Sequence, residues 1–147
     1  MIGYKVRTAD KRDITLLIPL VQADYLESLR GEITPDAVSQ TLSRFVGTGG
    51  DIWVTVDSTE LQGFGMGRVQ GEHYRVERIY ITPEVRHQHG GTALLTEQIN
   101  LARDVDARTI FAEVEHCNAI GLVLLTHHQF RITHEKDRTI ARRALTT

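Results

Sequence analysis

The sequence predicts a mixed α+β fold built on one central sheet. Strand and helix patterns follow one another in the order β-α-α-β-β-β-α-β-α-β-β. Three consecutive strand patterns in the middle of the chain favour an antiparallel meander, and the strand–helix–strand unit after them favours a parallel pair. The two together give a mixed sheet and not a doubly wound parallel one.

The first third of the chain predicts one short strand and two helices. Residues 4–7 have a strand pattern, and apolar residues at helical spacing follow it. Pro19 interrupts that spacing, so we expect the first helix to kink or break near Ile18. Thr34 and Pro35 are residue types of an N-cap and a first helical turn, so the second helix is expected to begin there and to end at the following glycines.

Three strands are expected next, at residues 52–56, 62–69 and 73–82. The second of them carries glycines at three alternate positions, 63, 65 and 67. Glycine in a strand marks a close approach by a ligand or by another part of the chain. Close packing against a helix and approach by a ligand are both open readings.

The last third completes the sheet. We expect a helix at residues 90–103, a strand at 109–114, a short helix at 118–128, and a closing hairpin from strands at 131–134 and 138–143. No repeat or linker interrupts this order, so the sequence predicts a single domain over residues 1–147.

The composition excludes several classes of protein. With 147 residues and a net charge of −2, the chain lacks the basic surplus of a nucleic-acid-binding protein. One cysteine excludes an intrachain disulfide, and no apolar run approaches the ~18 residues of a membrane span. The first residues lack the apolar core of a signal peptide. We therefore expect a cytoplasmic protein with no nucleic-acid or membrane partner.

Residues 79–95 carry the most informative pattern in the chain. A short β run meets Pro83, and a turn rich in glycine and basic residues then opens an amphipathic helix. The first N–H groups of a helix have no intrahelical partner, and its macrodipole favours anions there. Arg86 would add fixed charge, so the pattern predicts a phosphate-binding helix start.

The same run resembles the acyl-CoA pyrophosphate loop of the GNAT family of N-acetyltransferases, whose pattern is Arg/Gln-x-x-Gly-x-Gly/Ala. Arg86 and Gly91 match that pattern, whereas the first glycine is replaced by His89. The order of elements is similar to the whole family fold. The resemblance implies a splayed central sheet of six or seven strands with about four helices.

The resemblance also implies how acetyl-CoA, the acyl-donor co-substrate, would be held. Backbone groups of the strand before the loop would pair with the pantetheine arm, and the loop and the first helical turn would bind the phosphates. The implied residues are Ile79, Tyr80, Ile81, Arg86, His87, Gln88, His89, Gly90, Gly91, Thr92 and, in the later helix, Asn118. His89 would lend its backbone N–H alone or also a protonated ring, which would make binding depend on pH.

Acetylation of an amine needs a group that accepts a proton. Glu77 shares strand parity with Ile79 and Ile81, and the family often places a base on that strand. Glu113 matches a glutamate that some ribosomal-protein N-terminal acetyltransferases of the family use. Each is also open to interpretation as a solvated or salt-bridged glutamate, with Arg75 and Arg78 as partners.

The second landmark of the family lies in the short helix after the fifth strand. Asn118 and Phe130 match it, but Leu125 stands where the family has the tyrosine that protonates the departing thiolate, and Gln129 replaces a glycine. Substitute acids are Tyr80, Cys117 and His127. Cys117 is also a candidate acyl-accepting nucleophile or a small buried residue. The histidines show no ligand spacing, so no metal is expected.

The resemblance places the acceptor groove between the first two helices and at the hairpin of the sixth strand. Acidic residues between positions 22 and 35 suit a cationic amine, or simply face solvent. The sequence thus predicts direct acetyl transfer from acetyl-CoA to a small or peptide amine in a ternary complex. The alternative is a catalytically weak or inactive acyl-CoA-binding regulatory module. A nucleotide-binding protein is a third reading, and a homodimer is one oligomeric state that the family implies.

Overall fold

The computed structural model describes residues 5–57, 60–86, 89–114 and 119–145. The elements are β1 Lys5–Thr8, α1 Lys11–Glu27, α2 Pro35–Gly47, β2 Gly50–Asp57, β3 Glu60–Gln70, β4 His73–Ile81, the 3₁₀ turn η1 Pro83–Val85, α3 Gly90–Asp104, β5 Thr109–Val114, α4 Ala119–His127, β6 Arg131–His134 and β7 Thr139–Ala144. The predicted order is confirmed, with η1 as an addition.

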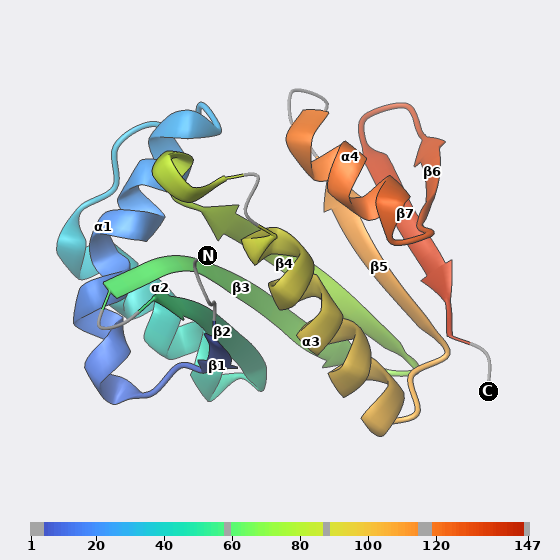
Figure 1. Ribbon diagram of the computed structural model, residues 1–147, viewed down its shortest axis with the longest axis horizontal. Coiled ribbons are helices and arrows are strands. Elements are labelled where there is room, and N and C mark those ends of the chain that lie inside the picture. The colour runs from blue at the N-terminus through green and yellow to red at the C-terminus, as the bar shows by residue number, and fades with distance from the viewer. Residues whose placement is uncertain (1–4, 58–59, 87–88, 115–118, 146–147) are drawn as a thin grey trace.

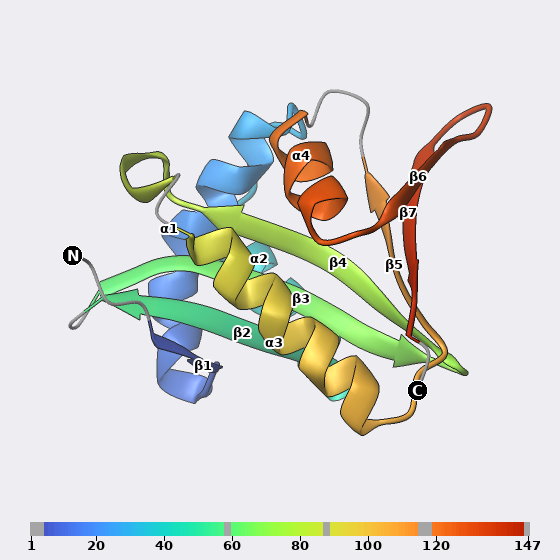
Figure 2. The same ribbon diagram turned by 45° about the vertical axis from the view of Figure 1, so that its right-hand side comes forward.

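The strands form one mixed seven-stranded sheet in the order β1-β2-β3-β4-β5-β7-β6. Every pair is antiparallel except β4 and β5, which the α3 crossover joins in parallel. Helices α1 and α2 cover one face of the first four strands, while α3 and α4 lie on the other face (Figures 1 and 2). The predicted fold class is therefore confirmed.

The two faces of the sheet have separate apolar cores. The core under α1 and α2 contains Leu17, Leu42 and Phe64, and the core under α3 and α4 contains Leu95, Ile110 and Phe130. Burial of these side chains is the main force that fixes the helices on the sheet.

Helix α1 begins at Lys11 and does not break at Pro19. Asp10 is the N-cap and forms a reciprocal capping box with Asp13. The helix then runs through Pro19 to Glu27. Proline removes one helical hydrogen bond, but the neighbouring apolar positions Leu17 and Val21 are buried against the sheet. Tertiary packing thus keeps the helix continuous, and the expected break does not occur.

Two of the alternate glycines of β3 allow close packing, Gly65 against α3 and Gly67 against Tyr74 of β4. A Cβ at Gly65 would lie 3.5 Å from Gln98 and Leu94 of α3. A Cβ at Gly67 would lie 2.3 Å from the hydroxyl oxygen of Tyr74, a fully buried side chain. Of the two readings, packing against a helix and a buried neighbour is the one that the structure supports.

Candidate functional site

Strands β4 and β5 separate halfway along their length. Their pairing runs from His73 with Thr109 to Val76 with Ala112 and ends there. Figure 1 shows the two strands diverging beyond this point, with α3 and α4 on either side of the opening. A splay of this kind exposes peptide groups of β4 to a ligand rather than to a neighbouring strand.

The ladder between β3 and β4 decides which peptide groups face the splay. The Thr82 N–H donates to the Gln62 carbonyl at 2.9 Å, so the peptide groups of residue 82 point to β3. The direction of the peptide groups alternates along a strand. Those of Tyr80 therefore point to β3, and those of Ile79 and Ile81 point toward β5. Among the three predicted pantetheine-binding residues, Ile79 and Ile81 therefore have the suitable backbone orientation.

The start of α3 has the features of an anion site. Its first intrahelical bond runs from Ala93 N–H to His89 C=O at 3.0 Å. The N–H groups of Gly90, Gly91 and Thr92 thus have no intrahelical partner. No acidic side chain lies in this first turn. The positive end of the helix dipole is therefore not neutralised from within α3.

Glycines bring this helix start close to the splay. A Cβ on Gly90 would lie 3.0 Å from Ile81 Cδ1, and one on Gly91 would lie 3.2 Å from Leu124 Cδ2. Both distances are shorter than ordinary contacts of a side chain, so larger residues would push α3 away from β4 or from α4. The two glycines thereby place three helical N–H groups beside the end of β4.

His89 precedes the helix with a left-handed backbone, φ 68°, and its side chain is exposed and caps nothing. The structure thus uses a glycine-type conformation at the position where the family pattern has glycine. The predicted loop residues His87 and Gln88 lie outside the described residues, as do Asn118 and Cys117.

Arg86 points away from α3. Its guanidinium binds both carboxylate oxygens of Glu27 on α1 at 2.6 Å, and its Nε donates to the Ile81 carbonyl at 2.9 Å. The hydrogen bond with Glu27 raises the pKa of Arg86 above its usual value. In this structure the side chain thus joins the loop to α1, and its contact with phosphate stays a prediction.

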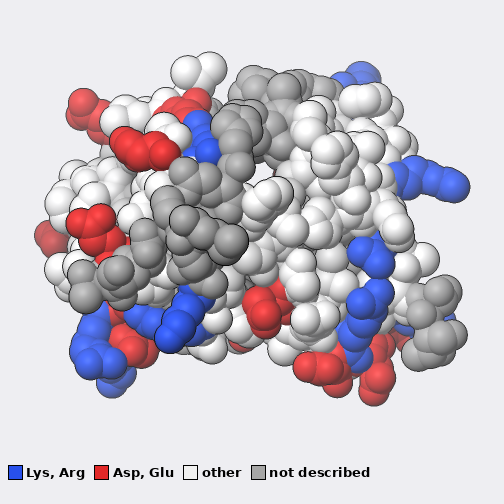
Figure 3. Space-filling view, viewed as in Figure 1, with Lys and Arg blue, Asp and Glu red and all other residues white. Residues whose placement is uncertain are grey.

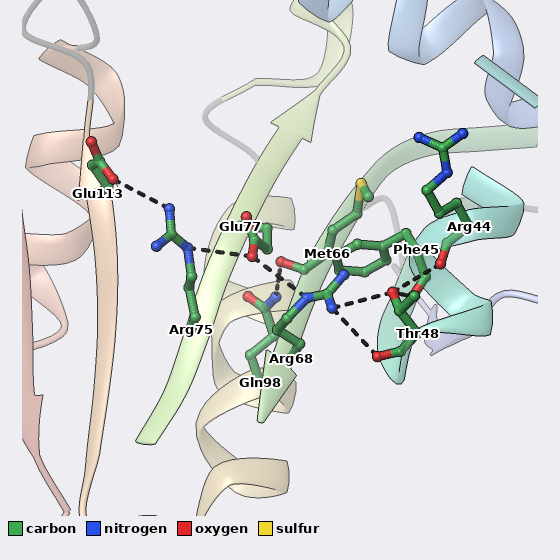
Figure 4. Close-up of polar contacts among 9 residues, drawn as sticks. All are labelled: Arg44, Phe45, Thr48, Met66, Arg68, Arg75, Glu77, Gln98 and Glu113. Atoms are coloured by element: carbon green, nitrogen blue, oxygen red, sulfur yellow. Dashed lines mark hydrogen bonds and ion pairs between the residues drawn. The ribbon is translucent and has the colours of Figure 1, made fainter. Parts of the chain in front are cut away.

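The two candidate carboxylates lie together. Arg75 Nε is 3.3 Å from Glu77 Oε1, and Arg75 Nη2 donates to Glu113 Oε2 at 3.3 Å (Figure 4). Glu77 also lies 3.7 Å from Arg68 Nε. Arg75 is thus the predicted partner of both glutamates, whereas Arg78 binds Asp24 and Ser28 on α1 instead.

A β-bulge places Glu77 on a different face from the one its parity predicts. Met66 pairs with Arg78 and Gly67 with Val76, so no residue of β3 lies opposite Glu77 in the backbone ladder. Its contact Arg68 stacks at 4.5 Å on Phe45 of α2, whereas Ile79 packs on the α3 side. The prediction that Glu77 lies on the same face of the sheet as Ile79 is therefore wrong, because the bulge shifts the alternation of side chains by one residue.

Leu125 is a core residue and offers no proton. The Phe130 N–H donates to the Leu125 carbonyl and the Gln129 N–H to the Thr126 carbonyl, both at 3.0 Å. These bonds form a Schellman motif, and Leu125 and Phe130 lie in the same apolar core. Of the substitute acids, Tyr80 is buried on the α1 side with its pKa raised by burial, and His127 is exposed at the end of α4.

The expected acidic acceptor region is largely paired. Acidic side chains gather over the C-terminal half of α1 and the loop after it (Figure 3, upper left). Asp24 binds Arg78, although burial outweighs this pair and raises the pKa of Asp24. Glu27 binds Arg86. Glu32 lines a hollow of about 270 Å³ together with Gln22, Leu26 and Ile33.

Sequence reasoning missed the two ion pairs that tie β4 and its loop to α1. Asp24 and Arg78 are 54 residues apart, and Glu27 and Arg86 are 59 apart. No spacing rule connects residues so distant, so a single sequence holds no signal for these pairs.

Two negative findings apply to the described part of the chain. No group of three potential metal ligands occurs among those residues. None of the helices there is long and apolar enough to cross a membrane.

Solved structures with the same fold include several acetyltransferases. PaiA N-acetyltransferase from Thermoplasma acidophilum, in complex with coenzyme A, is 16% identical with a TM-score of 0.81, and the match covers 98% of this chain and 100% of that one. Ribosomal-protein-alanine N-acetyltransferase from Brucella melitensis is 18% identical with a TM-score of 0.79, covering 96% and 99%. A phosphinothricin acetyltransferase from Sinorhizobium meliloti in complex with acetyl-CoA is 16% identical with a TM-score of 0.82, covering 97% and 88%.

No curated protein matched the sequence. At these identities the solved structures establish the fold alone. The model of the acetyltransferase (GNAT) family matches residues 18–124, which include the splayed strands, the α3 helix start and most of α4. The chain belongs to the GNAT acetyltransferase family.

Proposed function

We propose that this protein is an N-acetyltransferase that moves an acetyl group from acetyl-CoA to a primary amine by direct transfer in a ternary complex. The observation that carries the proposal is the meeting of the β4–β5 splay with the start of α3. A pantetheine arm needs unpaired strand groups, and a diphosphate needs unpaired helical N–H groups. The end of β4 and the first turn of α3 offer both within one site.

The residues fit a coenzyme A molecule. The N–H groups of Gly90, Gly91 and Thr92 would hold the diphosphate. The backbone of Ile79 and Ile81 would pair with the pantetheine arm and direct an N–H at the thioester carbonyl. Such a donor stabilises the negative charge that develops on that oxygen during attack. The complexes of the Thermoplasma and Sinorhizobium proteins with coenzyme A and acetyl-CoA support this assignment.

The chemistry then needs one proton acceptor. A neutral amine attacks the thioester carbonyl, the C–N bond forms and the C–S bond breaks. The surplus proton of the amine passes to Glu77 or Glu113, directly or through water. The thiolate leaves and takes a proton from solvent, because Leu125 has none to give.

The test is a thiol-release assay with acetyl-CoA and a panel of amines, amino acids and peptides. The wild-type protein should release coenzyme A only when a suitable amine is present. Removal of a general base lowers kcat by about 10²–10⁴-fold. Replacing the glutamate that accepts the proton, Glu77→Gln or Glu113→Gln, should therefore lower kcat to this extent and leave the KM for acetyl-CoA nearly unchanged. Wild-type turnover in both variants would exclude the two glutamates.

Leu125 favours a second candidate, an acyl-CoA-binding module that does not catalyse transfer. Its side chain is buried in the apolar core and supplies no acid at that point of α4. Acetyl-CoA binding measured by titration calorimetry, combined with no thiol release on any amine, would favour the module. Tight ATP binding without acetyl-CoA binding would exclude both candidates.

A further inference from the structure

Arg75 occupies the fork at which β4 and β5 separate. It pairs in register with Phe111, one residue before the last pair, Val76 with Ala112. The first residues beyond that last pair are Glu77 on β4 and Glu113 on β5. Arg75 is in ion-pair contact with both of them, at 3.3 Å each (Figure 4).

Further contacts fix the direction of the arginine. Its guanidinium carbon lies 5.7 Å from the centre of the Phe111 ring, within the range of a cation–π contact. The Arg75 side chain is 28% exposed, compared with 29% for Glu77 and 39% for Glu113. The three side chains are therefore partly shielded from water, where an ion pair is stronger than on an open surface.

Each glutamate has one more cation beside it, but that cation is not shared. Glu77 meets Arg68 at 3.7 Å, and Arg68 is itself anchored on Phe45 and Thr48 of the α2 end. Glu113 meets Arg138 at 4.0 Å, next to β7. Among the described residues, Arg75 is the one cation whose ion pairs join both carboxylates.

We propose that Arg75 is a positioning residue that holds Glu77 and Glu113 in fixed orientations at the fork, so that one of them can accept the proton of the bound amine. The inference rests on the proposed acetyl transfer. A carboxylate on a diverging strand end has free rotamers, and a bridging cation selects one of them. Displacement of a catalytic group by about 1 Å can cost on the order of 100-fold in rate.

Binding of acetyl-CoA should depend little on Arg75. The backbone pairs up to Val76 and Ala112 already hold the two strands together. The N–H groups proposed for the diphosphate lie on α3. A loss of Arg75 should therefore change kcat and leave the dissociation constant of acetyl-CoA nearly unchanged.

The experiment compares Arg75→Met and Arg75→Lys with the wild-type protein, and uses Arg108→Met as the matched control. Arg108 pairs with Glu72 at the other end of the same two strands, and both of these side chains are mostly exposed. Arg75→Met should lower kcat by about 10–100-fold with the acetyl-CoA dissociation constant within about twofold of wild type. Arg75→Lys should regain part of the rate, and Arg108→Met should keep it. Arg75→Gln replaces Arg75→Met if the latter does not fold.

A double-mutant comparison shows whether Arg75 acts through the carboxylates. Arg75→Met is added to Glu77→Gln and, separately, to Glu113→Gln. In the background that lacks the proton-accepting glutamate, the further loss of kcat should nearly vanish. An equal loss in both backgrounds would mean a general structural role and would overturn the inference.

The outcomes separate this inference from the proposed function. No turnover by the wild-type protein on any amine would overturn the transferase function, and the inference with it. Turnover by the wild-type protein together with an unchanged kcat in Arg75→Met would overturn the inference alone.

Discussion

At the scale of single residues, two non-glycine residues adopt the left-handed backbone conformation typical of glycine, at positions where the family pattern has glycine. His89 and Gln129 stand at two positions where the family pattern has glycine, and both adopt φ 68°. Leu29 and Asp106, at the ends of α1 and α3, are also left-handed. A side chain in this region costs roughly 1–2 kcal/mol, so the backbone path is fixed by the hydrogen bonds around it rather than by residue preference.

Glycine at these positions should stabilise the protein. His89→Gly and Gln129→Gly relieve the left-handed strain but add about 0.5–1 kcal/mol of chain entropy to the unfolded state. Each should raise the free energy of unfolding by a net ~0.5–1 kcal/mol, measured by urea denaturation.

The control is Val123→Gly, on the exposed side of α4. It should lower the free energy of unfolding by about 0.5–1 kcal/mol, because glycine in a helix interior relieves nothing. Destabilisation by both His89→Gly and Gln129→Gly would contradict the account of these two positions. Since His89→Gly also restores the family loop, acetyl-CoA should bind it somewhat more tightly than wild type.

At the scale of elements, an ion pair between Arg7 of β1 and Asp13 of α1 makes the stability of the fold depend on pH. Arg7 binds Asp13 through two hydrogen bonds of 2.6 and 3.0 Å, and Asp13 also accepts the Asp10 N–H at 2.8 Å. The hydrogen bond from Arg7 is the main reason that the pKa of Asp13 is lowered. The folded-state pKa lies below the unfolded value of about 3.9, so this stabilisation is complete above that value and is lost as the pH falls through the folded-state pKa.

The variant Asp13→Asn should therefore be less stable by about 1–3 kcal/mol at neutral pH, since a buried amide cannot replace the paired hydrogen bonds that the carboxylate accepts from Arg7. Below pH ~4 its free energy of unfolding should fall less steeply than that of wild type. Urea unfolding at several pH values between about 2 and 7 measures both effects. Parallel curves for the two proteins in the acid range would contradict the assignment.

A second prediction at this scale compares alanine substitutions at two glycines of β3, with Gly65 as the control for Gly67. Gly67→Ala places a Cβ 2.3 Å from the Tyr74 oxygen, and the Tyr74 side chain is fully buried. Gly65→Ala makes contacts of 3.5 Å, which are ordinary. Thermal unfolding should show a loss of about 1–3 kcal/mol for Gly67→Ala and a much smaller change for Gly65→Ala. Equal effects would mean that the Tyr74 ring is not packed against β3 as closely as described.

The helices and strands of this chain could be predicted from local sequence patterns, whereas the site depends on tertiary packing and on a β-bulge, which such patterns do not predict. The order of elements, the Thr34 cap and the helix start at Gly90 were predictable because apolar periodicity and capping residues are local signals. The continuity of α1 through Pro19 was not, since it depends on packing against the sheet. The side of the sheet to which Glu77 belongs was not predictable either, because one bulged residue reverses the alternation.

At the scale of the whole molecule, two ion pairs connect the proposed donor and acceptor sides. Arg78 and Arg86 come from β4 and its loop, and their partners Asp24 and Glu27 lie on α1. Arg78 and Arg86 are thereby held against α1, the helix that borders the expected acceptor groove. These arginines pair with two acidic residues of the expected acceptor region, while Glu32 lines the hollow of about 270 Å³.

The splay and the start of α3 together form the proposed acetyl-CoA site. A crystal structure of the complex with acetyl-CoA tests this proposal most directly. We expect the diphosphate within hydrogen-bond distance of the N–H groups of Gly90, Gly91 and Thr92, and the thioester between β4 and β5 beyond Val76 and Ala112. Acetyl-CoA bound away from the splay, or held with its diphosphate off the start of α3, would contradict the account.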